Sequence, residues 1–127
     1  MSHFFLEAFE HVHKNRAAEY EELSRQTDLK VKETEPGMLI HAQTKVLETD
    51  EKNVYRWQET FSSYAGFEAH ITNPHTQKHI EALNNGILCA PLEVVIYCDW
   101  NDEQKAPWLE VEGISLRFAE LVNGYYV

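Results

Sequence analysis

The chain has 127 residues, enough for one domain that buries roughly two thirds of the surface of its unfolded chain. Its formal net charge of −10 argues against nucleic acid or an anionic membrane as a partner, because phosphate groups bind basic surfaces. The apolar runs fall short of the ~20 residues that span a bilayer, and Glu7 interrupts the short one near the N-terminus. We therefore expect a cytoplasmic protein without a membrane segment.

The first half of the chain predicts a strand, a helix and a second strand. Apolar and polar residues alternate over residues 4–12, which is typical of a strand with one buried face. Asn15 is a candidate N-cap for a helix that continues to about Thr34. Its inner stripe consists of Tyr20, Leu23, Thr27 and Val31. Pro36-Gly37 ends this helix, and residues 38–47 form the next strand.

The second half of the chain predicts a third strand, a second helical region and a fourth strand. A polar turn over residues 49–53 leads into a third strand at 54–61. A helical region follows over 63–86, with a restart at Asn73-Pro74, where proline suits the first helical position. The mostly apolar and β-branched run 92–99 is a buried fourth strand. The order βαββαβ predicts an α+β, ferredoxin-like sandwich over residues 1–99.

Residues 100–127 are a C-terminal extension with a predicted β-strand. A polar connection over 101–107 comes first, and Ile114, Leu116 and Phe118 then alternate with less apolar residues. We expect this extension to pack on the domain or on a partner subunit. Because two helices cover only one face of a four-stranded sheet, the other face is expected to meet the sheet of a second copy.

One face of the third strand contains the first candidate site residue. Side chains alternate along a strand, so Tyr55, Trp57, Glu59 and Phe61 share the face expected to look toward the helices. Glu59 is then a carboxylate between two aromatic rings. It could accept a proton or orient a histidine. The alternative is a structural carboxylate paired with a lysine, an arginine or a backbone N–H.

The second predicted helix contributes an inward-facing histidine. Phe67, His70 and Ile71 lie on the side of this helix that continues through Ile80 and Leu83. An imidazole titrates near neutral pH and is suited to taking a phenolic proton. His70 could equally be a core histidine that bonds a backbone carbonyl or Glu59. His41, in the second strand, is a further candidate for the cavity wall or for the dimer face.

No motif predicts a metal or nucleotide site. His75 and His79 have the i, i+4 spacing of helix-borne ligands, but the expected inner stripe places them toward solvent, and no cysteine pair adds ligands. The five glycines form no phosphate-binding loop. We therefore expect no metal and no cofactor.

Four short motifs in this order resemble the antibiotic biosynthesis monooxygenase family. They are Glu35-Pro36-Gly37, Glu59-x-Phe61, Phe67-x-x-His70 and Pro74-His75, and the resemblance covers about residues 4–99. The resemblance implies a homodimeric α+β barrel with a pocket between sheet and helices in each subunit. Family members include quinol and anthrone oxygenases that use no metal or flavin. Phe61 departs from the family pattern, because members commonly carry tryptophan there.

Taken together, these observations predict a cofactor-independent monooxygenase for a small aromatic or quinol-like substrate and dioxygen. His70 and Glu59 would be catalytic, and Tyr55, Trp57, Phe61, His41 and Phe67 would contact the substrate. Two alternatives stay open: a non-catalytic small-molecule-binding dimer, and an isomerase or cyclase that uses the same pocket without oxygen.

Overall fold

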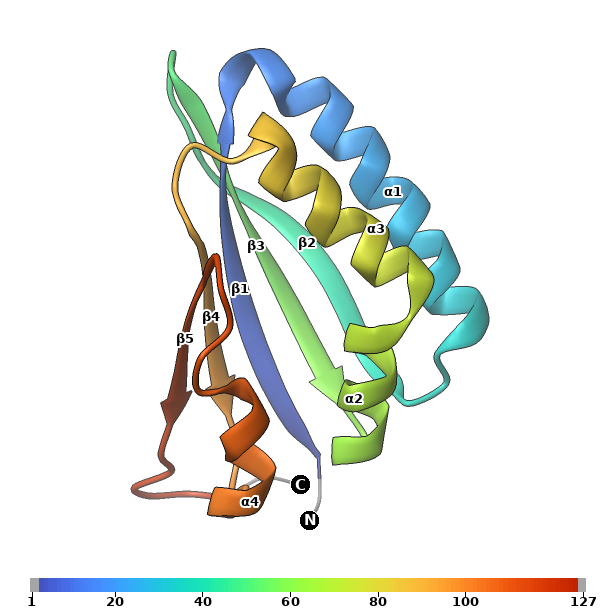
Figure 1. Ribbon diagram of the computed structural model, residues 1–127, viewed down its shortest axis with the longest axis vertical. Helices are drawn as coiled ribbons and strands as arrows, with labels where there is room; N and C mark the ends of the chain where they lie inside the picture. Colours follow the sequence, from blue (N-terminus) through green and yellow to red (C-terminus); the bar gives the residue numbers. More distant parts are fainter. Residues whose placement is uncertain (1–2, 126–127) are drawn as a thin grey trace.

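A computed structural model describes residues 3–125 as a five-stranded mixed sheet with helices α1, α2 and α3 on one face (Figure 1). The strand order is β2-β3-β1-β4-β5, and only β4 and β5 run parallel. This is the predicted ferredoxin-like βαββαβ arrangement with a β-strand added after it. The elements are β1 (Phe4–His13), α1 (Ala17–Thr34), β2 (Met38–Glu48), β3 (Lys52–Phe61), α2 (Tyr64–Thr72), α3 (Pro74–Ala82), β4 (Leu92–Tyr97), α4 (Asp102–Lys105) and β5 (Ile114–Ala119).

The two central strands, β1 and β3, decide which side chains face the helices. Directly paired residues of antiparallel strands lie on the same face, and Leu6 pairs with Glu59 while Ala8 pairs with Trp57. Burial alternates along both strands, as the sequence predicted. Glu10 follows the same alternation as Leu6 and Ala8, so this carboxylate also points into the interior, where it is 3% exposed.

The start of α1 differs from the prediction. Asn15 is not its N-cap, because residues Lys14–Arg16 form a turn of 3₁₀-helix and α1 begins after Arg16. No side chain caps this end of α1. The predicted inner stripe is otherwise present, since Tyr20, Thr27 and Val31 are buried and Ser24 joins them.

The restart at Asn73-Pro74 divides the second helical region into two helices. Asn73 has an extended backbone (φ −65°, ψ 143°), and Pro74 takes the first position of α3 as predicted. Because an extended residue interrupts the helical repeat, the inner face of α2 does not continue in phase along α3. The buried side chains of α3 are accordingly Thr76 and His79.

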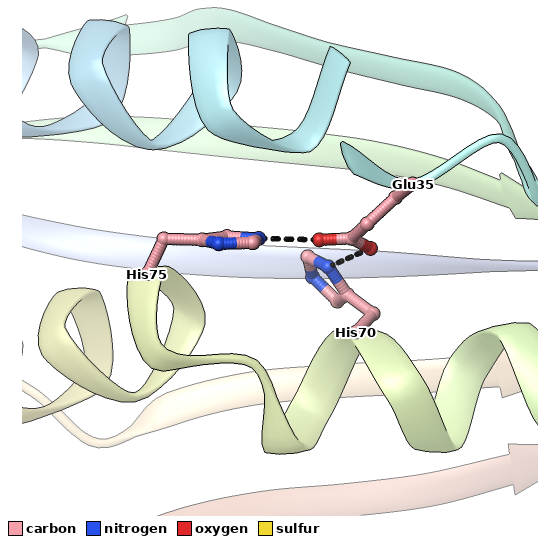
Figure 2. Close-up of side chains that lie close together, drawn as sticks. All are labelled: Glu35, His70 and His75. Atoms are coloured by element: carbon pink, nitrogen blue, oxygen red, sulfur yellow. Dashed lines mark hydrogen bonds and ion pairs between the residues drawn. The ribbon is translucent and has the colours of Figure 1, made fainter. Parts of the chain in front are cut away.

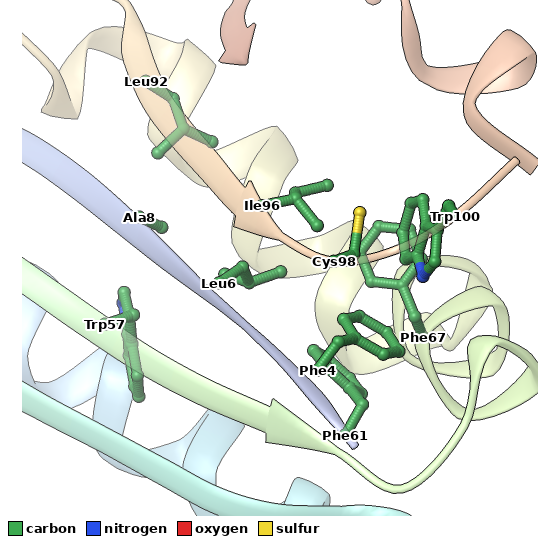
Figure 3. Close-up of a cluster of buried hydrophobic side chains, with 10 residues drawn as sticks. All are labelled: Phe4, Leu6, Ala8, Trp57, Phe61, Phe67, Leu92, Ile96, Cys98 and Trp100. Carbon is green, nitrogen blue, oxygen red and sulfur yellow. The ribbon is translucent and has the colours of Figure 1, made fainter. Parts of the chain in front are cut away.

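The C-terminal segment packs against the helix-facing side of the sheet. Trp100 is 4% exposed and contacts the rings of Phe4 and Phe67, at centroid distances of 4.9 and 5.3 Å (Figure 3). It also contacts the ring of Phe118, at 5.8 Å. The predicted connection over 101–107 is partly helical, and Asn101 and Gln104 form a capping box at the start of α4. No helix within residues 3–125 is long and apolar enough to cross a bilayer.

Trp100 should therefore attach the C-terminal segment to the domain. We expect Trp100→Ala to lower the free energy of unfolding by ~3–5 kcal/mol, because it leaves a cavity among packed aromatic rings. Chemical denaturation followed by fluorescence or circular dichroism measures this change. Leu109→Ala is the matched control, since Leu109 is 63% exposed and its truncation should cost less than ~0.5 kcal/mol. A loss below ~1 kcal/mol for Trp100→Ala would contradict this role.

Candidate functional site

A cavity of about 250 Å³ lies between the helix-facing side of the sheet and helices α2 and α3. A cavity of this size is near the lower end of the range for small-molecule sites. Most of its wall is apolar and aromatic, and the polar groups in it are mainly histidines and carboxylates. The apolar wall consists of Leu6, Ala8, Trp57, Phe67, Ile71, Ile80, Leu92, Val94, Trp108, Val111, Ile114 and Leu116. The main titratable groups are Glu10, His41, Glu59, His70, His79 and Glu112.

Five of the seven predicted site residues line this cavity, namely His41, Trp57, Glu59, Phe67 and His70. Tyr55 and Phe61 lie on the same strand face but do not line it. At one end of β3, Phe61 is fully buried and stacks on Phe4 at 5.3 Å between ring centroids. At the other end, Tyr55 packs on Tyr20 at 4.6 Å. The predicted alternation along β3 is present, but the aromatic rings of neighbouring elements fill the space at both ends of this strand. Only the middle residues of β3 therefore reach the cavity.

Glu35, the residue after α1, holds two histidines of the second helical region (Figure 2). Its carboxylate accepts a hydrogen bond from His70 Nδ1 at 2.8 Å and another from His75 Nε2 at 2.5 Å. Burial alone would raise the pKa of Glu35, but the hydrogen bonds from His70 and His75 lower the pKa to about 2. Glu35 is therefore an anion at neutral pH, and it fixes Nδ1 of His70 as a hydrogen-bond donor.

The opposite nitrogen of His70 faces Glu59 across the cavity wall. His70 Nε2 lies 3.4 Å from Glu59 Oε1, and His41 Nε2 lies 3.9 Å from Glu59 Oε2. The side chains of His41, Glu59 and His70 are 8%, 9% and 6% exposed, respectively. Burial would lower the pKa of His70, but the charge of Glu59 and the hydrogen bond to Glu35 raise this pKa above its ordinary value. The imidazole and carboxylate predicted from the sequence therefore meet in one cavity.

His41 connects this group of charges to the surface. Its Nδ1 donates to Asp28 Oδ1 at 2.8 Å, and the Asp28 side chain is 46% exposed. Its ring stacks on Trp57 with the centroids 4.4 Å apart and the planes 25° apart. His41 therefore lies between the buried carboxylate Glu59 and a carboxylate that reaches solvent.

A second polar group surrounds Glu10, on the far side of Trp57. Glu10 Oε1 accepts hydrogen bonds from Trp57 Nε1, at 2.8 Å, and from the hydroxyl of Tyr20. His79 Nε2 lies 3.5 Å from Glu10 Oε2, and its Nδ1 lies 3.3 Å from the Thr27 hydroxyl oxygen. Burial, followed by the charge of Glu10, raises the pKa of Tyr20, so this phenol stays protonated.

The prediction that His75 and His79 face solvent was wrong. His79 is buried and lines the cavity, and the His75 side chain is only 14% exposed. The reason is the break at Asn73, which resets the helical phase between α2 and α3. The i, i+4 spacing does not bring the two histidines onto a common partner, since His75 bonds Glu35 and His79 contacts Thr27 and Glu10.

Sequence reasoning missed Glu10 and Glu35 as site residues. The signal for Glu10 was present, because it continues the alternation of Phe4, Leu6 and Ala8 onto the buried face. Glu35 carries a weaker signal, because it belongs to a turn motif and its two partners are 35 and 40 residues away in the chain.

Two overlapping groups in the described residues have the composition and spacing of metal ligands. One consists of Glu35, His70 and His75, and the other of His41, Glu59 and His70. In each group the candidate ligand atoms lie within 4.8 Å of one another. Both groups depend on His70, so at most one of them can use a given nitrogen of this ring.

Solved structures share this fold at low sequence identity. A protein of Caulobacter crescentus, provisionally named as an antibiotic biosynthesis monooxygenase, aligns over 80% of this chain and 92% of its own, with a TM-score of 0.68 and 22% identity. A similarly named protein of Nitrosomonas europaea aligns over 80% and 93%, with a TM-score of 0.67 and 15% identity. No family model matches the sequence, and no curated protein matches it. The chain therefore has the fold of structures named as antibiotic biosynthesis monooxygenases, and the predicted resemblance is confirmed at the level of fold.

Proposed function

We propose that this protein is a monooxygenase that oxidises a small phenolic or quinol-like substrate with dioxygen and without a cofactor. The observation that carries the proposal is the meeting of His70 and Glu59, 3.4 Å apart, in the wall of a mainly apolar cavity. The names of the structures that share the fold point to the same reaction class.

His70 is the proposed base, because its two nitrogens have different surroundings. Nδ1 is committed to Glu35, whereas Nε2 faces the cavity and Glu59. A phenol in the cavity would give its proton to Nε2, and the imidazolium would then lie between two carboxylates that stabilise its charge. Glu59 would orient this proton and hold the positive charge close to the new phenolate.

The substrate itself would supply the electrons for the reaction. The phenolate reduces dioxygen, the resulting radical pair combines into a peroxide, and the O–O bond then breaks. One oxygen atom stays in the product as a carbonyl. The other leaves as water with the two hydrogens that the substrate loses, so that no external reductant is needed. The aromatic rings of Trp57, Phe67 and Trp108 would hold the substrate plane and exclude water from these steps.

We further propose that two copies of the chain pack through the sheet face opposite the helices. This face presents Phe5, Phe9, Ile40, Ala42 and Tyr97 at alternate strand positions, and no helix of residues 3–125 covers it (Figure 1). Ile40 is 44% exposed, and Phe5 and Tyr97 stack at 4.5 Å to form an apolar centre. A second sheet would bury these side chains.

Replacing the proposed base should abolish most of the activity. We expect His70→Gln to lower the rate of oxygen consumption with quinols or anthrones by ~10²–10⁴-fold, the usual contribution of a positioned base. An oxygen electrode measures this rate, and His13→Gln, which changes an exposed histidine, is the matched control. Full activity in a His70→Gln, Glu59→Gln double variant would refute the assignment. Turnover that continues unchanged under nitrogen would instead favour an isomerase.

The activity should rise with pH through the pKa of His70, because only the neutral imidazole accepts a proton. Burial lowers that pKa, but Glu59 on β3 and Glu35 after α1 favour the imidazolium and together raise the pKa above its ordinary value. The groups around His70 also include His41 on β2 and His75 on α3. Glu59→Gln removes one negative charge and should move the acid limb of the pH–rate profile to lower pH.

The same ion pairs contribute to stability with the opposite dependence on pH. Because the folded pKa of His70 is raised, the contribution of these ion pairs to stability is complete below the pKa of an unfolded histidine, and it is lost as the pH rises through the folded value.

In the pH–rate measurement, Glu103→Gln on exposed α4 is the control and should leave the pH–rate profile unchanged. An acid limb that does not move in Glu59→Gln would contradict the coupling of His70 to Glu59.

The dimer prediction can be tested on the exposed sheet face. The wild-type chain should sediment at twice its mass of 14.8 kDa. Ala42→Arg should sediment as a monomer with an unchanged circular dichroism spectrum, because Ala42 is exposed in the single chain. An exposed change on the helix side, Glu33→Arg, should leave the dimer intact. A wild-type monomer at all accessible concentrations would contradict this interface.

A further inference from the structure

We propose that His41 Nε2, a Glu59 carboxylate oxygen and His70 Nε2 form a binding site for a divalent transition-metal ion. Glu59 lies between the two imidazoles, with its Oε1 3.4 Å from His70 Nε2 and its Oε2 3.9 Å from His41 Nε2, and one ligand atom from each of the three residues lies within 4.8 Å of the other two. Ligands held ~2.1 Å from one ion are ~3.0 Å apart at a right angle and ~3.4 Å apart in a tetrahedron. The three groups come from β2, β3 and α2, and small side-chain rotations would bring them onto one ion.

The other nitrogens of both rings have the partners that metal-binding histidines usually have. His41 Nδ1 donates to Asp28 at 2.8 Å, and His70 Nδ1 donates to Glu35 at 2.8 Å. A metal-ligating histidine usually donates its second N–H to a carboxylate or a carbonyl, which fixes the tautomer and aims the free nitrogen. Here two imidazoles are fixed in this way, and both aim at the same carboxylate.

In this arrangement, lone pairs on nitrogen and oxygen face each other, and a cation between them would remove their repulsion. A neutral imidazole whose Nδ1 holds the proton presents a lone pair at Nε2. In both rings that lone pair would face an oxygen of Glu59, which is also an acceptor. Either a proton or a metal ion between the nitrogen and the oxygen removes the repulsion. Among the described residues, no lysine or arginine forms an ion pair with Glu10, Glu35 or Glu59, so histidines are the only cationic partners of these buried carboxylates.

The ligand types narrow the choice of ion. Two imidazoles and one carboxylate suit Zn²⁺, Co²⁺ or Fe²⁺, whereas Mg²⁺ and Ca²⁺ prefer oxygen ligands. Three protein ligands leave at least one coordination position, and it would face the cavity because all three side chains line it. The site would thus have the open form of a reactive metal centre.

The overlapping group of Glu35, His70 and His75 is the weaker candidate. Both of its nitrogens already hydrogen-bond Glu35, at 2.8 and 2.5 Å, and these separations are shorter than those between ligands of one ion. An ion at that position would also remove the carboxylate that orients His70. The two candidates differ in His41 and His75, so the two histidines can be tested separately.

Metal binding at His70 Nε2 goes beyond the proposed reaction and opposes it. The same nitrogen cannot accept a substrate proton while it ligates an ion. A bound metal ion would therefore inhibit the cofactor-independent oxygenase.

Titration with Zn²⁺ by calorimetry, and with Co²⁺ by visible absorption, tests the site on the chelator-treated, full-length protein. We expect one ion per chain. Asp28→Asn should weaken binding by ~10–100-fold, as loss of a carboxylate behind a ligating histidine does. It is the key variant, because Asp28 is half exposed and its replacement should not disturb folding. His41→Asn should weaken binding at least as much, while His75→Gln should change the dissociation constant by less than about threefold.

Two results would overturn the site: no binding of Co²⁺ or Zn²⁺ at millimolar concentration, or loss of binding in His75→Gln but not in His41→Asn. Oxygen consumption, measured separately, keeps this proposal distinct from the proposed function. Activity that persists in EDTA and falls when Zn²⁺ is added agrees with both proposals. Activity that is lost in EDTA while Zn²⁺ binding is retained would overturn the cofactor-independent reaction and leave the metal site standing.

Discussion

Within residues 3–125, three buried carboxylates have only histidines as cationic partners, and this is the constraint on which the rest of the site depends. As whole residues, Glu10, Glu35 and Glu59 are 3%, 8% and 7% exposed, and removing a carboxylate from water is costly unless hydrogen bonds and opposite charges compensate. Imidazoles can supply both, but only in set orientations. His41, His70, His75 and His79 are therefore held by the acids, and the acids by them. This mutual dependence explains why residues of β1, β2, β3, α2, α3 and the segment after α1 meet within 4 Å of one another's charged atoms.

Much of the fold followed from local patterns, because alternation and helical spacing report which side chains are buried. The alternation on β3 correctly placed Trp57 and Glu59 toward the helices, and the spacing on α2 correctly turned His70 inward. Local patterns of this kind do not show which residues of different elements come together in the folded chain. The sequence therefore does not predict the pairing of Glu35 with His70 and His75. It predicts the break at Asn73, but not the change that this break makes to the helical phase of α3. The pairing of β5 with β4 likewise depends on the path of residues 98–113, which local periodicity does not describe.

The shared fold and the chemistry of the cavity support the proposals in different ways. Structures at 22% identity or less show where helices and sheet lie, but function depends on the groups in the cavity. In this chain the decisive group is a single nitrogen, His70 Nε2, which faces Glu59 with its partner nitrogen already committed. Protonation and metal binding are the two ways to satisfy that contact. The two proposals are thus alternative states of one site, and the supply of protons and metal ions would decide between them.

The C-terminal segment gives the cavity a largely apolar wall, in which Glu112 is the one titratable group among the described residues. Trp108, Val111, Ile114 and Leu116 all line the cavity, whereas the histidines and the three buried carboxylates belong to the preceding elements. Substitutions or changes of length after Trp100 could therefore enlarge, narrow or reshape the chamber while leaving the acid–imidazole contacts in place. In evolutionary terms, the choice of bound molecule could diverge through the tail alone, with the group of histidines and carboxylates inherited intact.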